Sequence, residues 1–173
     1  IYCPRVIYAE GKYRMWLSGS EVRPTLYRSC IGYAESDDGL EWTLHPDNPI
    51  LTADGLSWGQ SLHTPRVLFD EDEKLYKMWF CSTTHVEYRE DGILAKDIKN
   101  ALGYATSRDG IEWEFYPEPL IEECRAPCVH KEDGRYRMWL NASPSPEDSW
   151  ENVYGYVYEY WSDDGIDWTR HDR

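Results

Sequence analysis

The chain has 173 residues, of which 41% are hydrophobic and 15% aromatic, so we expect one folded domain with a packed core. Its net charge of −14 produces a field that repels phosphate backbones and anionic lipid, which argues against nucleic acid and membranes as partners. No apolar run approaches the roughly 20 residues of a bilayer span and no signal peptide is recognisable, but the sequence does not indicate a compartment.

Three similar units follow one another along the chain. Each begins with a strand pattern that opens on a proline and continues to a Met-Trp pair, in "PRVIYAEGKYRMWLSG" (4–19), "PRVLFDEDEKLYKMWFCS" (65–82) and "PCVHKEDGRYRMWLNA" (127–142). Each then carries a second motif, in "SDDGLEW" (36–42), "SRDGIEW" (107–113) and "SDDGIDW" (162–168). We place the units at residues 2–51, 63–121 and 124–173 of a single domain.

Each unit is predicted to form four short strands. In the first unit we expect them at residues 5–9, 13–18, about 30–35 and 41–44, with turn residues between them. The Asp-Gly pair of the second motif predicts a tight turn, because Gly accepts the positive φ angle that such a turn requires. Trp42, Trp113 and Trp168 are expected to pack back over this turn, so the motif recurs for structural reasons.

A four-stranded antiparallel sheet that repeats along a chain is typical of a β-propeller blade, so the predicted fold is all-β, with three blades. Both short turns of each blade lie at one end, because the strands alternate in direction. The opposite end carries the variable connections, of which the loop at about 81–100 is the longest. Binding and catalysis are usually placed on such loops, and we expect the functional site there.

The remaining tryptophans and the cysteines have structural interpretations. Trp16, Trp79 and Trp139 recur in the second strand of each unit and are expected in the core or between blades. The five cysteines are odd in number and contain no CxxC pair, which favours free thiols over a disulfide or a zinc site; they are Cys3, Cys30, Cys81, Cys124 and Cys128.

These repeated motifs resemble the blades of the five-bladed propeller glycosidases, the superfamily of arabinanases, xylosidases, invertases and β-mannoside phosphorylases. The resemblance implies a sugar-binding funnel on the propeller axis, with carboxylates that often directly precede the Pro of the innermost strand. Cys3, Thr64 and Ala126 occupy those positions here, and none is acidic. Three units instead of five also imply part of a longer propeller, or a ring completed by oligomerisation.

Glycoside cleavage requires a proton donor and a second carboxylate. Glu122 and Glu123 precede the third inner strand and are our candidates for the acid, with Asp54 in the first connection between blades as a possible partner. Each of them has an alternative interpretation as a solvated acid in a chain with 32 acidic residues.

Candidate sugar-binding residues lie near the starts of the inner strands and in the connections. Arg5, Arg66 and Arg125 could converge on a carboxylate or phosphate, or pair with local acids. His63 and His85 could bond sugar hydroxyl groups, and Trp58 could stack on a sugar ring.

We therefore predict a glycosidase-like protein that cleaves an oligosaccharide by hydrolysis or phosphorolysis. The alternative is a non-catalytic carbohydrate-binding or interaction module that has lost its catalytic acids. No cofactor is predicted; the resemblance permits calcium on the axis, although no residue pattern specifies it. A small sugar or oligosaccharide is the expected ligand, and a homo-oligomer is possible if the chain is complete.

Overall fold

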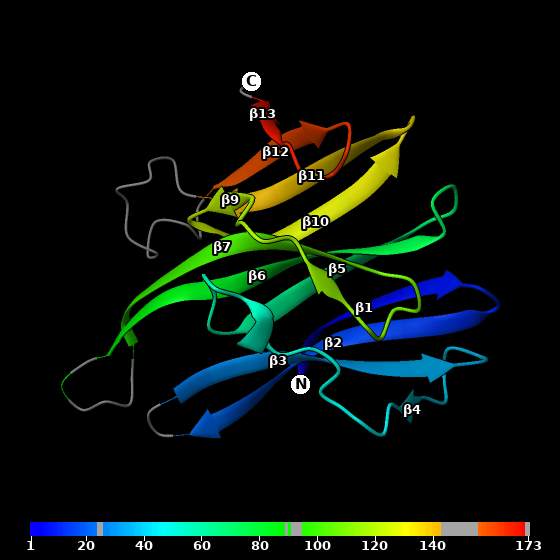
Figure 1. Cartoon of the computed structure of the whole chain (residues 1–173), viewed down its shortest axis with the longest axis horizontal. Helices are drawn as coiled ribbons and strands as arrows, with labels where there is room; N and C mark the ends of the chain where they lie inside the picture. Colours follow the sequence, from blue (N-terminus) through cyan, green and yellow to red (C-terminus); the bar gives the residue numbers. More distant parts are fainter. Residues whose placement is uncertain (24–25, 89, 91–94, 143–155, 172–173) are drawn as a thin grey trace.

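The computed structural model describes residues 1–23, 26–88, 90, 95–142 and 156–171 (Figure 1). These residues form three antiparallel sheets that follow one another along the chain, with one short 3-10 helix at Ala53–Gly55 between the first two. The predicted all-β fold with three blade-like sheets is confirmed. None of the described segments forms a helix long and apolar enough to cross a bilayer.

Each sheet has the strand order of a meander, in which neighbours in sequence are neighbours in the sheet. The first blade contains β1 (Tyr2–Ala9), β2 (Lys12–Arg23), β3 (Leu26–Ser36) and β4 (Thr43–Leu44). The second contains β5 (Leu62–Asp70), β6 (Leu75–Tyr88), β7 (Ala95–Ser107) and β8 (Glu114–Phe115), and β9 (Ile121–Glu122) also pairs with β7. The third contains β10 (Cys124–Glu132), β11 (Arg135–Ala142), β12 (Val157–Ser162) and β13 (Thr169–His171).

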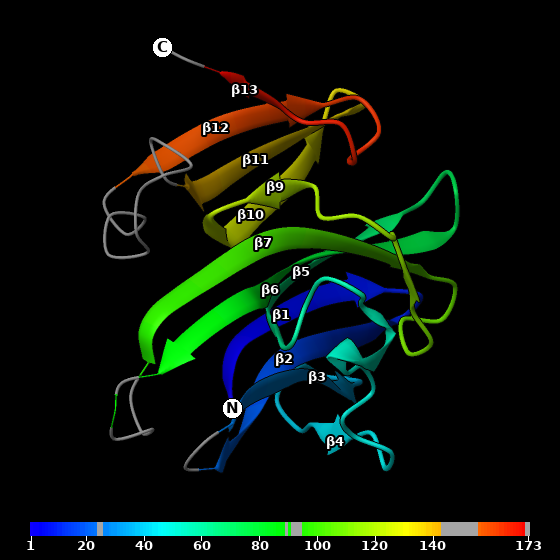
Figure 2. The same ribbon diagram turned by 60° about the vertical axis from the view of Figure 1, so that its left-hand side comes forward.

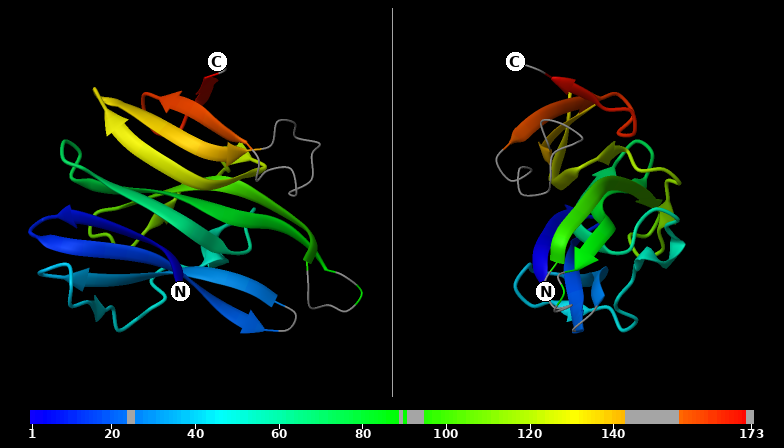
Figure 3. Two further views of the ribbon diagram at one scale, coloured as in Figure 1. Left: turned by 180° about the vertical axis from the view of Figure 1, so that it is seen from behind. Right: turned by 90° about the vertical axis from the view of Figure 1, so that its left-hand side faces the viewer.

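The blades stack face to face, from the first blade in blue to the third in orange and red (Figure 2). Their first strands are neighbours in space, since β5 contacts both β1 and β10. The same succession of sheets is visible from behind and from the side (Figure 3). Strands β1, β5 and β10 are therefore the inner strands, and their ends determine where a shared site can form.

The region at about 81–100, which we expected to be a loop, is largely a long hairpin. Strand β6 continues to Tyr88 and β7 starts at Ala95, with paired residues that include Thr83↔Asn100 and His85↔Lys99. Tyr, Val and Ile within the segment suit a strand, and backbone pairing satisfies their N–H and C=O groups. The charged residues Glu87, Glu90 and Lys99 of this segment are exposed, as expected for a ribbon that faces solvent.

The Ser-x-Asp-Gly-x-x-Trp motif forms the same compact turn in each blade. In the first, Ser36 Oγ accepts a hydrogen bond from the Gly39 N–H at 2.8 Å, and Asp38 Oδ1 accepts one from the Leu40 N–H at 2.8 Å. Gly39 has a φ of +76°, a conformation that favours glycine. The Trp42 indole donates to the Gly39 carbonyl at 3.2 Å, so the predicted packing of this tryptophan over the turn is confirmed.

Tryptophans connect this turn to the preceding blade. Trp16 is fully buried and donates from Nε1 to the carbonyl of Gly110 in the second blade at 2.8 Å. Trp79 is also fully buried and donates in the same way to Gly165 of the third blade at 2.7 Å. Each indole thus packs between two blades and donates a hydrogen bond to a turn of the next blade. Together these contacts hold the neighbouring sheets in their relative positions.

The third repeated tryptophan, Trp139, differs from this pattern. It is only partly buried, because no further sheet among the described residues covers its face of the third blade. The Arg137 guanidinium lies 4.5 Å from its ring centroid, and the His130 ring packs edge-on at 5.9 Å. Our expectation that Trp139 lies in a core or between two blades is therefore wrong for the described part of the chain.

All five cysteines are free thiols, as predicted. Cys81 and Cys124 are buried, Cys30 and Cys128 are partly buried, and Cys3 is exposed.

Candidate functional site

Each inner strand contains a bulge at the residue before its proline. The regular pairing with the second strand is interrupted between Tyr2 and Arg5, between His63 and Arg66, and between Arg125 and Cys128. The pre-proline residues have left-handed backbone angles, with φ of 49° at Cys3, 53° at Thr64 and 51° at Ala126. This conformation is unfavourable for residues other than glycine, above all for a β-branched threonine, and such strain is often found at functional sites.

A pocket of about 270 Å³ lies at the bulges of the second and third blades. Its walls come from the starts of inner strands and from the β6–β7 and β11 strand ends, at the end of the blades opposite the Asp-Gly turns; they are Tyr2, His63, Thr64, Thr83, Ile98, Asn100, Arg125, Ala126 and Asn141. The volume is near the lower end of the range for small-molecule sites.

Asn100 organises the polar side of the pocket. The hydrogen-bond network assigns its amide oxygen to Arg125, where it accepts from Nε and Nη2 at 2.9 Å each. The amide nitrogen then donates to Thr83 Oγ1 and His63 Nε2, both at 3.2 Å. One neutral side chain thereby holds the guanidinium and the imidazole in fixed positions.

His63 is neutral at physiological pH. Burial, and then the positive charge of Arg125, lowers the pKa of His63 to about 4. Because Nε2 accepts a hydrogen bond from Asn100, the single proton of the neutral ring lies on Nδ1. His63 therefore offers this pocket a hydrogen bond and not a second positive charge.

Arg5 and Arg66 do not occupy the position of Arg125. They follow their prolines and pair with Trp16 and Trp79, a register that Cys128 occupies in the third blade. Arg5 Nε donates to the Val67 carbonyl at 3.2 Å, and Arg66 Nε donates to the Val129 carbonyl at 2.7 Å.

Burial, and then the positive charge of Arg66, lowers the pKa of Arg5 to about 10. Each arginine connects its blade to the next inner strand. Neither lines the pocket around Arg125, so a shared role of Arg5, Arg66 and Arg125 in holding one ligand stays a prediction.

The three candidate acids lie outside the pocket walls. Asp54 is exposed in the short 3-10 helix and accepts a hydrogen bond from Thr52 Oγ1 at 2.8 Å. Glu122 is exposed on β9. Glu123 is different, since its side chain is only 12% exposed, it has a φ of 50°, and its carboxylate lies 3.6 Å from Lys99 Nζ. It stands two residues before Arg125, and Lys99 adjoins Asn100, which places Glu123 closest to the pocket along the chain.

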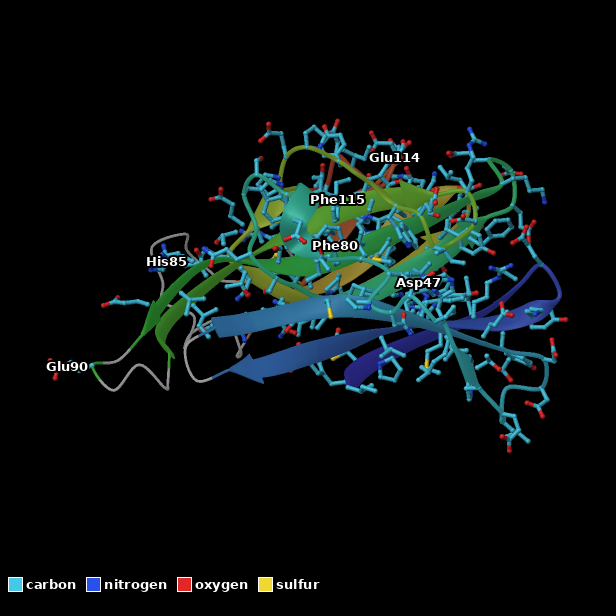
Figure 4. The ribbon with its side chains drawn as sticks, turned by 60° about the horizontal axis from the view of Figure 1, so that its bottom comes forward. Asp47, Phe80, His85, Glu90, Glu114 and Phe115 are labelled. Atoms are coloured by element: carbon cyan, nitrogen blue, oxygen red, sulfur yellow. The ribbon has the colours of Figure 1, made fainter. Side chains whose placement is uncertain are left out.

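Two further candidates do not line the pocket. Trp58 stacks on Phe80 with ring centroids 6.5 Å apart and packs against the core between the first two blades. His85 is exposed on the outer part of β6, far along the ribbon from Phe80 (Figure 4). Of the nine predicted site residues, the structure brings His63 and Arg125 together in the pocket.

Several lining residues were not predicted from the sequence. Tyr2, His63 and Arg125 occupy the same register in the three blades, pairing with Ser18, Cys81 and Asn141. An alignment of the units by their bulges would have identified Tyr2 and Asn141. Asn100 and Thr83 could not have been found by such an alignment, because they lie in the long β6–β7 hairpin, where the three units do not repeat one another.

Within the described ranges, no group of three or more His, Cys, Asp or Glu side chains is arranged to hold a metal ion. The donor atoms that line the pocket are a guanidinium, an imidazole, amides and hydroxyls, a set suited to an organic ligand with hydroxyl or oxyanion groups.

No protein-family model matches the chain. An uncharacterized protein of Mycobacterium tuberculosis (strain CDC 1551 / Oshkosh) is 29% identical over 152 residues, which cover 83% of this chain and 45% of that protein. A second uncharacterized protein, from strain ATCC 25618 / H37Rv, is 28% identical over the same shares. The chain thus spans less than half the length of these relatives.

Solved structures give a clearer likeness. A glycoside hydrolase superposes with a TM-score of 0.72 at 18% identity, covering 96% of this chain and 51% of that one. A structure from the GH130 family of mannoside phosphorylases, which contains glycoside hydrolases that target β-1,2 mannosidic linkages in Candida mannan, gives 0.62 at 20% identity over 99% and 48%. A GH32 β-fructofuranosidase of Bombyx mori gives 0.66 at 12% identity over 98% and 36%. The chain therefore has the fold of the propeller-type glycoside hydrolases and phosphorylases, and it spans between about a third and a half of these three structures.

Proposed function

We propose that this chain forms part of a carbohydrate-active protein that binds an oligosaccharide at the pre-proline ends of its inner strands and cleaves a glycosidic bond there. The observation that carries the proposal is the pocket around Arg125, His63 and Asn100, which lies at the strained bulges of the second and third blades in a glycosidase-type fold. Amide, hydroxyl and imidazole groups suit sugar hydroxyls, and Ile98 and Ala126 offer apolar contact to a sugar ring.

Glu123 is our candidate for the general acid of this reaction. Its side chain is largely buried and the residue directly precedes β10, the strand that carries Arg125, whereas Glu122 and Asp54 are exposed. A general acid must reach the glycosidic oxygen within hydrogen-bond distance once substrate is bound. A second carboxylate is also required, and Glu122 and Asp54 remain proposals for that role.

A second candidate function is sugar binding without catalysis. It is favoured by one observation: among the described residues that line the pocket, none is acidic. A site of this composition can hold a sugar, but it needs a carboxylate from elsewhere to protonate a leaving group.

The two functions are separated by measuring binding and turnover in the same preparation. The chain would be screened against aryl glycosides, with and without inorganic phosphate, while monosaccharide binding is followed by calorimetry. We expect Arg125→Ala to abolish binding and Glu123→Gln to abolish turnover with binding retained. Binding without turnover by the unmodified chain would favour the binding module, and no sugar binding at all would contradict both functions.

A further inference from the structure

Two arginines on the inner strands have no acidic partner. Elsewhere arginine pairs with carboxylates, as Arg137 does with Glu159 at 2.8 Å. Arg5 and Arg66 are partly buried, yet neither forms an ion pair with an acidic side chain of the described ranges. The chain has 32 acidic residues, so this absence is unusual for two adjacent arginines. A guanidinium in such surroundings is available to an anionic ligand.

The strand register places the two arginines at the same level of the inner face. They occupy equivalent positions on β1 and β5, paired with Trp16 and Trp79, and these two inner strands contact each other. Arg5 Nε donates to the carbonyl of Val67, the residue that follows Arg66. The guanidinium of Arg5 therefore lies against the stretch of β5 from which the Arg66 side chain starts. Burial, and then the charge of Arg66, lowers the pKa of Arg5, in agreement with this placement.

The contacts of each arginine leave N–H donors for a ligand. A guanidinium has five N–H donors. Arg5 uses one, from Nε to Val67, and neither of its Nη groups bonds a described residue. Arg66 donates from Nε to the Val129 carbonyl, its Nη2 lies 3.3 and 3.4 Å from the ring nitrogens of His130, and its Nη1 bonds no described residue. The backbone contacts thus orient both guanidiniums and leave Nη donors on each.

The charge of this region favours a phosphate group over a carboxylate. His130 adds no charge near neutral pH, because burial and then the charges of Arg66 and Arg5 lower its pKa. The two arginines thus supply two positive charges. A phosphate group carries about 1.5 to 2 negative charges near neutral pH and at least three acceptor oxygens, which suits two guanidiniums. A carboxylate would neutralise one arginine and leave the charge of the other uncompensated.

We propose that Arg5 and Arg66 form an anion site on the inner face of the first two blades and that this site binds a phosphate group, as inorganic phosphate or as part of a phosphorylated sugar. The Nη groups of both arginines donate to its oxygens, and the Nε bonds to the next inner strand hold the guanidiniums in place. The site is separate from the pocket around Arg125, which neither arginine lines, so the proposal does not depend on the proposed function.

Calorimetric titration of the chain at constant ionic strength tests the charge and shape of the ligand. Inorganic phosphate, sulfate and glucose 6-phosphate would be compared with acetate. We expect phosphate and sulfate to bind at least about tenfold more tightly than acetate, because two guanidiniums hold two negative charges. Tighter binding of glucose 6-phosphate than of phosphate would identify a phosphorylated sugar as the ligand, and equal binding would identify the phosphate group alone; both results support the site.

Three variants locate the binding. Arg5→Gln and Arg66→Gln each remove one guanidinium and should weaken phosphate binding at least about tenfold. Arg135→Gln is the matched control, because it removes the same charge from an exposed arginine that pairs with Asp163 outside the site. It should bind phosphate as the unmodified chain does. Circular dichroism and thermal unfolding of each variant establish that it is folded.

The NMR signals of the arginine Nε–H groups in the unmodified chain provide a second measurement, which decides the question if a variant does not fold. Phosphate should shift the Nε–H signals of Arg5 and Arg66 and leave that of Arg135 unchanged. Binding of acetate as tight as that of phosphate would overturn the choice of phosphate. No phosphate binding, or shifts that spare both arginines, would overturn the site itself. Sugar binding at the pocket is measured separately, so none of these results decides the proposed function.

Discussion

The two ends of the inner strands differ in how closely the three blades repeat one another. At the turn end, the Ser-x-Asp-Gly-x-x-Trp sequence and its hydrogen bonds recur in every blade. At the pre-proline end, the backbone bulge recurs but its side chains do not, since Tyr2, His63 and Arg125 share one register. The same backbone bulge therefore follows a phenol, an imidazole and a guanidinium in the three blades.

The difference shows which residues build the fold and which are available for binding. Gly110 and Gly165 have a positive φ and lie against the indole of the preceding blade, where a Cβ would lie 2.9 Å from Trp16 and 2.8 Å from Trp79, so the stacking of the sheets requires glycine at these turns. Residues at the bulges line a cavity, so we expect their identity to be constrained mainly by the ligand that the cavity holds. Substitutions at the turn end should hence affect stability, and substitutions at the bulge end should affect binding.

The largest expected effect is at Asp70, near the turn between β5 and β6. Its side chain is 2% exposed and accepts from Lys131 Nζ at 2.8 Å and from the Tyr136 hydroxyl at 2.9 Å, both in the next blade. Asp70→Asn leaves Lys131 and the buried Lys77 without this charge and should lower the free energy of unfolding by about 3 kcal/mol in urea titrations.

Glu10 provides the matched control for Asp70. It accepts from the Tyr76 hydroxyl of the next blade at 2.5 Å, but its side chain is 48% exposed. Glu10→Gln removes the charge that faces Arg14 but should cost less than about 1 kcal/mol, because solvent screens this half-exposed pair. Equal losses in the two variants would show that burial of the carboxylate does not determine the effect.

A comparable effect is expected where a turn glycine contacts a tryptophan. Gly165 has a φ of +83°, and a Cβ there would lie 2.8 Å from Trp79 Cζ2. Gly165→Ala combines backbone strain with a clash and should cost about 3 kcal/mol in chemical unfolding. Gly134 also has a positive φ, of +80°, but a Cβ there would meet no other atom. Gly134→Ala therefore measures the cost of backbone strain alone, which should be about 1 kcal/mol. Equal costs would mean that the fit against Trp79 contributes nothing.

The tryptophans test the stacking of blades with a smaller change. Trp79→Phe removes the hydrogen bond to Gly165 and part of a fully buried ring, and should lower the melting temperature by an amount equivalent to about 2 kcal/mol. Trp139→Phe changes the same repeat position on the uncovered face and should cost less than about 1 kcal/mol. If the two variants lose equal stability, the covered and uncovered positions are not energetically distinct.

The smallest effect concerns pH and lies at the bulge end. The pKa of His63 is about 4 in the folded chain and 6.5 in the absence of perturbation, so the unfolded chain takes up a proton first as the pH falls. Stability should consequently decline between about pH 6.5 and pH 4, by roughly 1 to 2 kcal/mol after allowance for partial exposure. His130, whose pKa is also lowered by burial and by Arg66, contributes to the same decline, so His63→Gln should reduce it without abolishing it in urea titrations at about pH 7 and pH 5. An unchanged slope in the variant would exclude His63 as a contributor.

The repeat made the fold predictable, because each blade encodes its own turn and its own Trp. It did not reveal that the segment at 81–100 continues the sheet, since exposed ribbons and loops share a charged composition. Trp139 was placed wrongly because burial depends on what covers the blade and not on the motif itself.

The candidate site was less accessible to sequence reasoning. His63 was recognisable from its place in the variable connections, and Arg125 from its place at the start of an inner strand. Arg5 and Arg66 have a different register that only strand pairing shows. Asn100 comes from a strand of the hairpin and reaches Arg125 through tertiary packing alone. A single sequence contains no signal for such a contact.

The central claim, that ligands bind at the bulge end of the inner strands, can be tested by NMR titration of the isotope-labelled chain with a sugar that binds. We predict shifts in the side-chain amides of Asn100 and Asn141 and in the His63 imidazole, with the indole N–H signals of Trp113 and Trp168 unchanged. Shifts confined to those indoles at the turn end would contradict the claim.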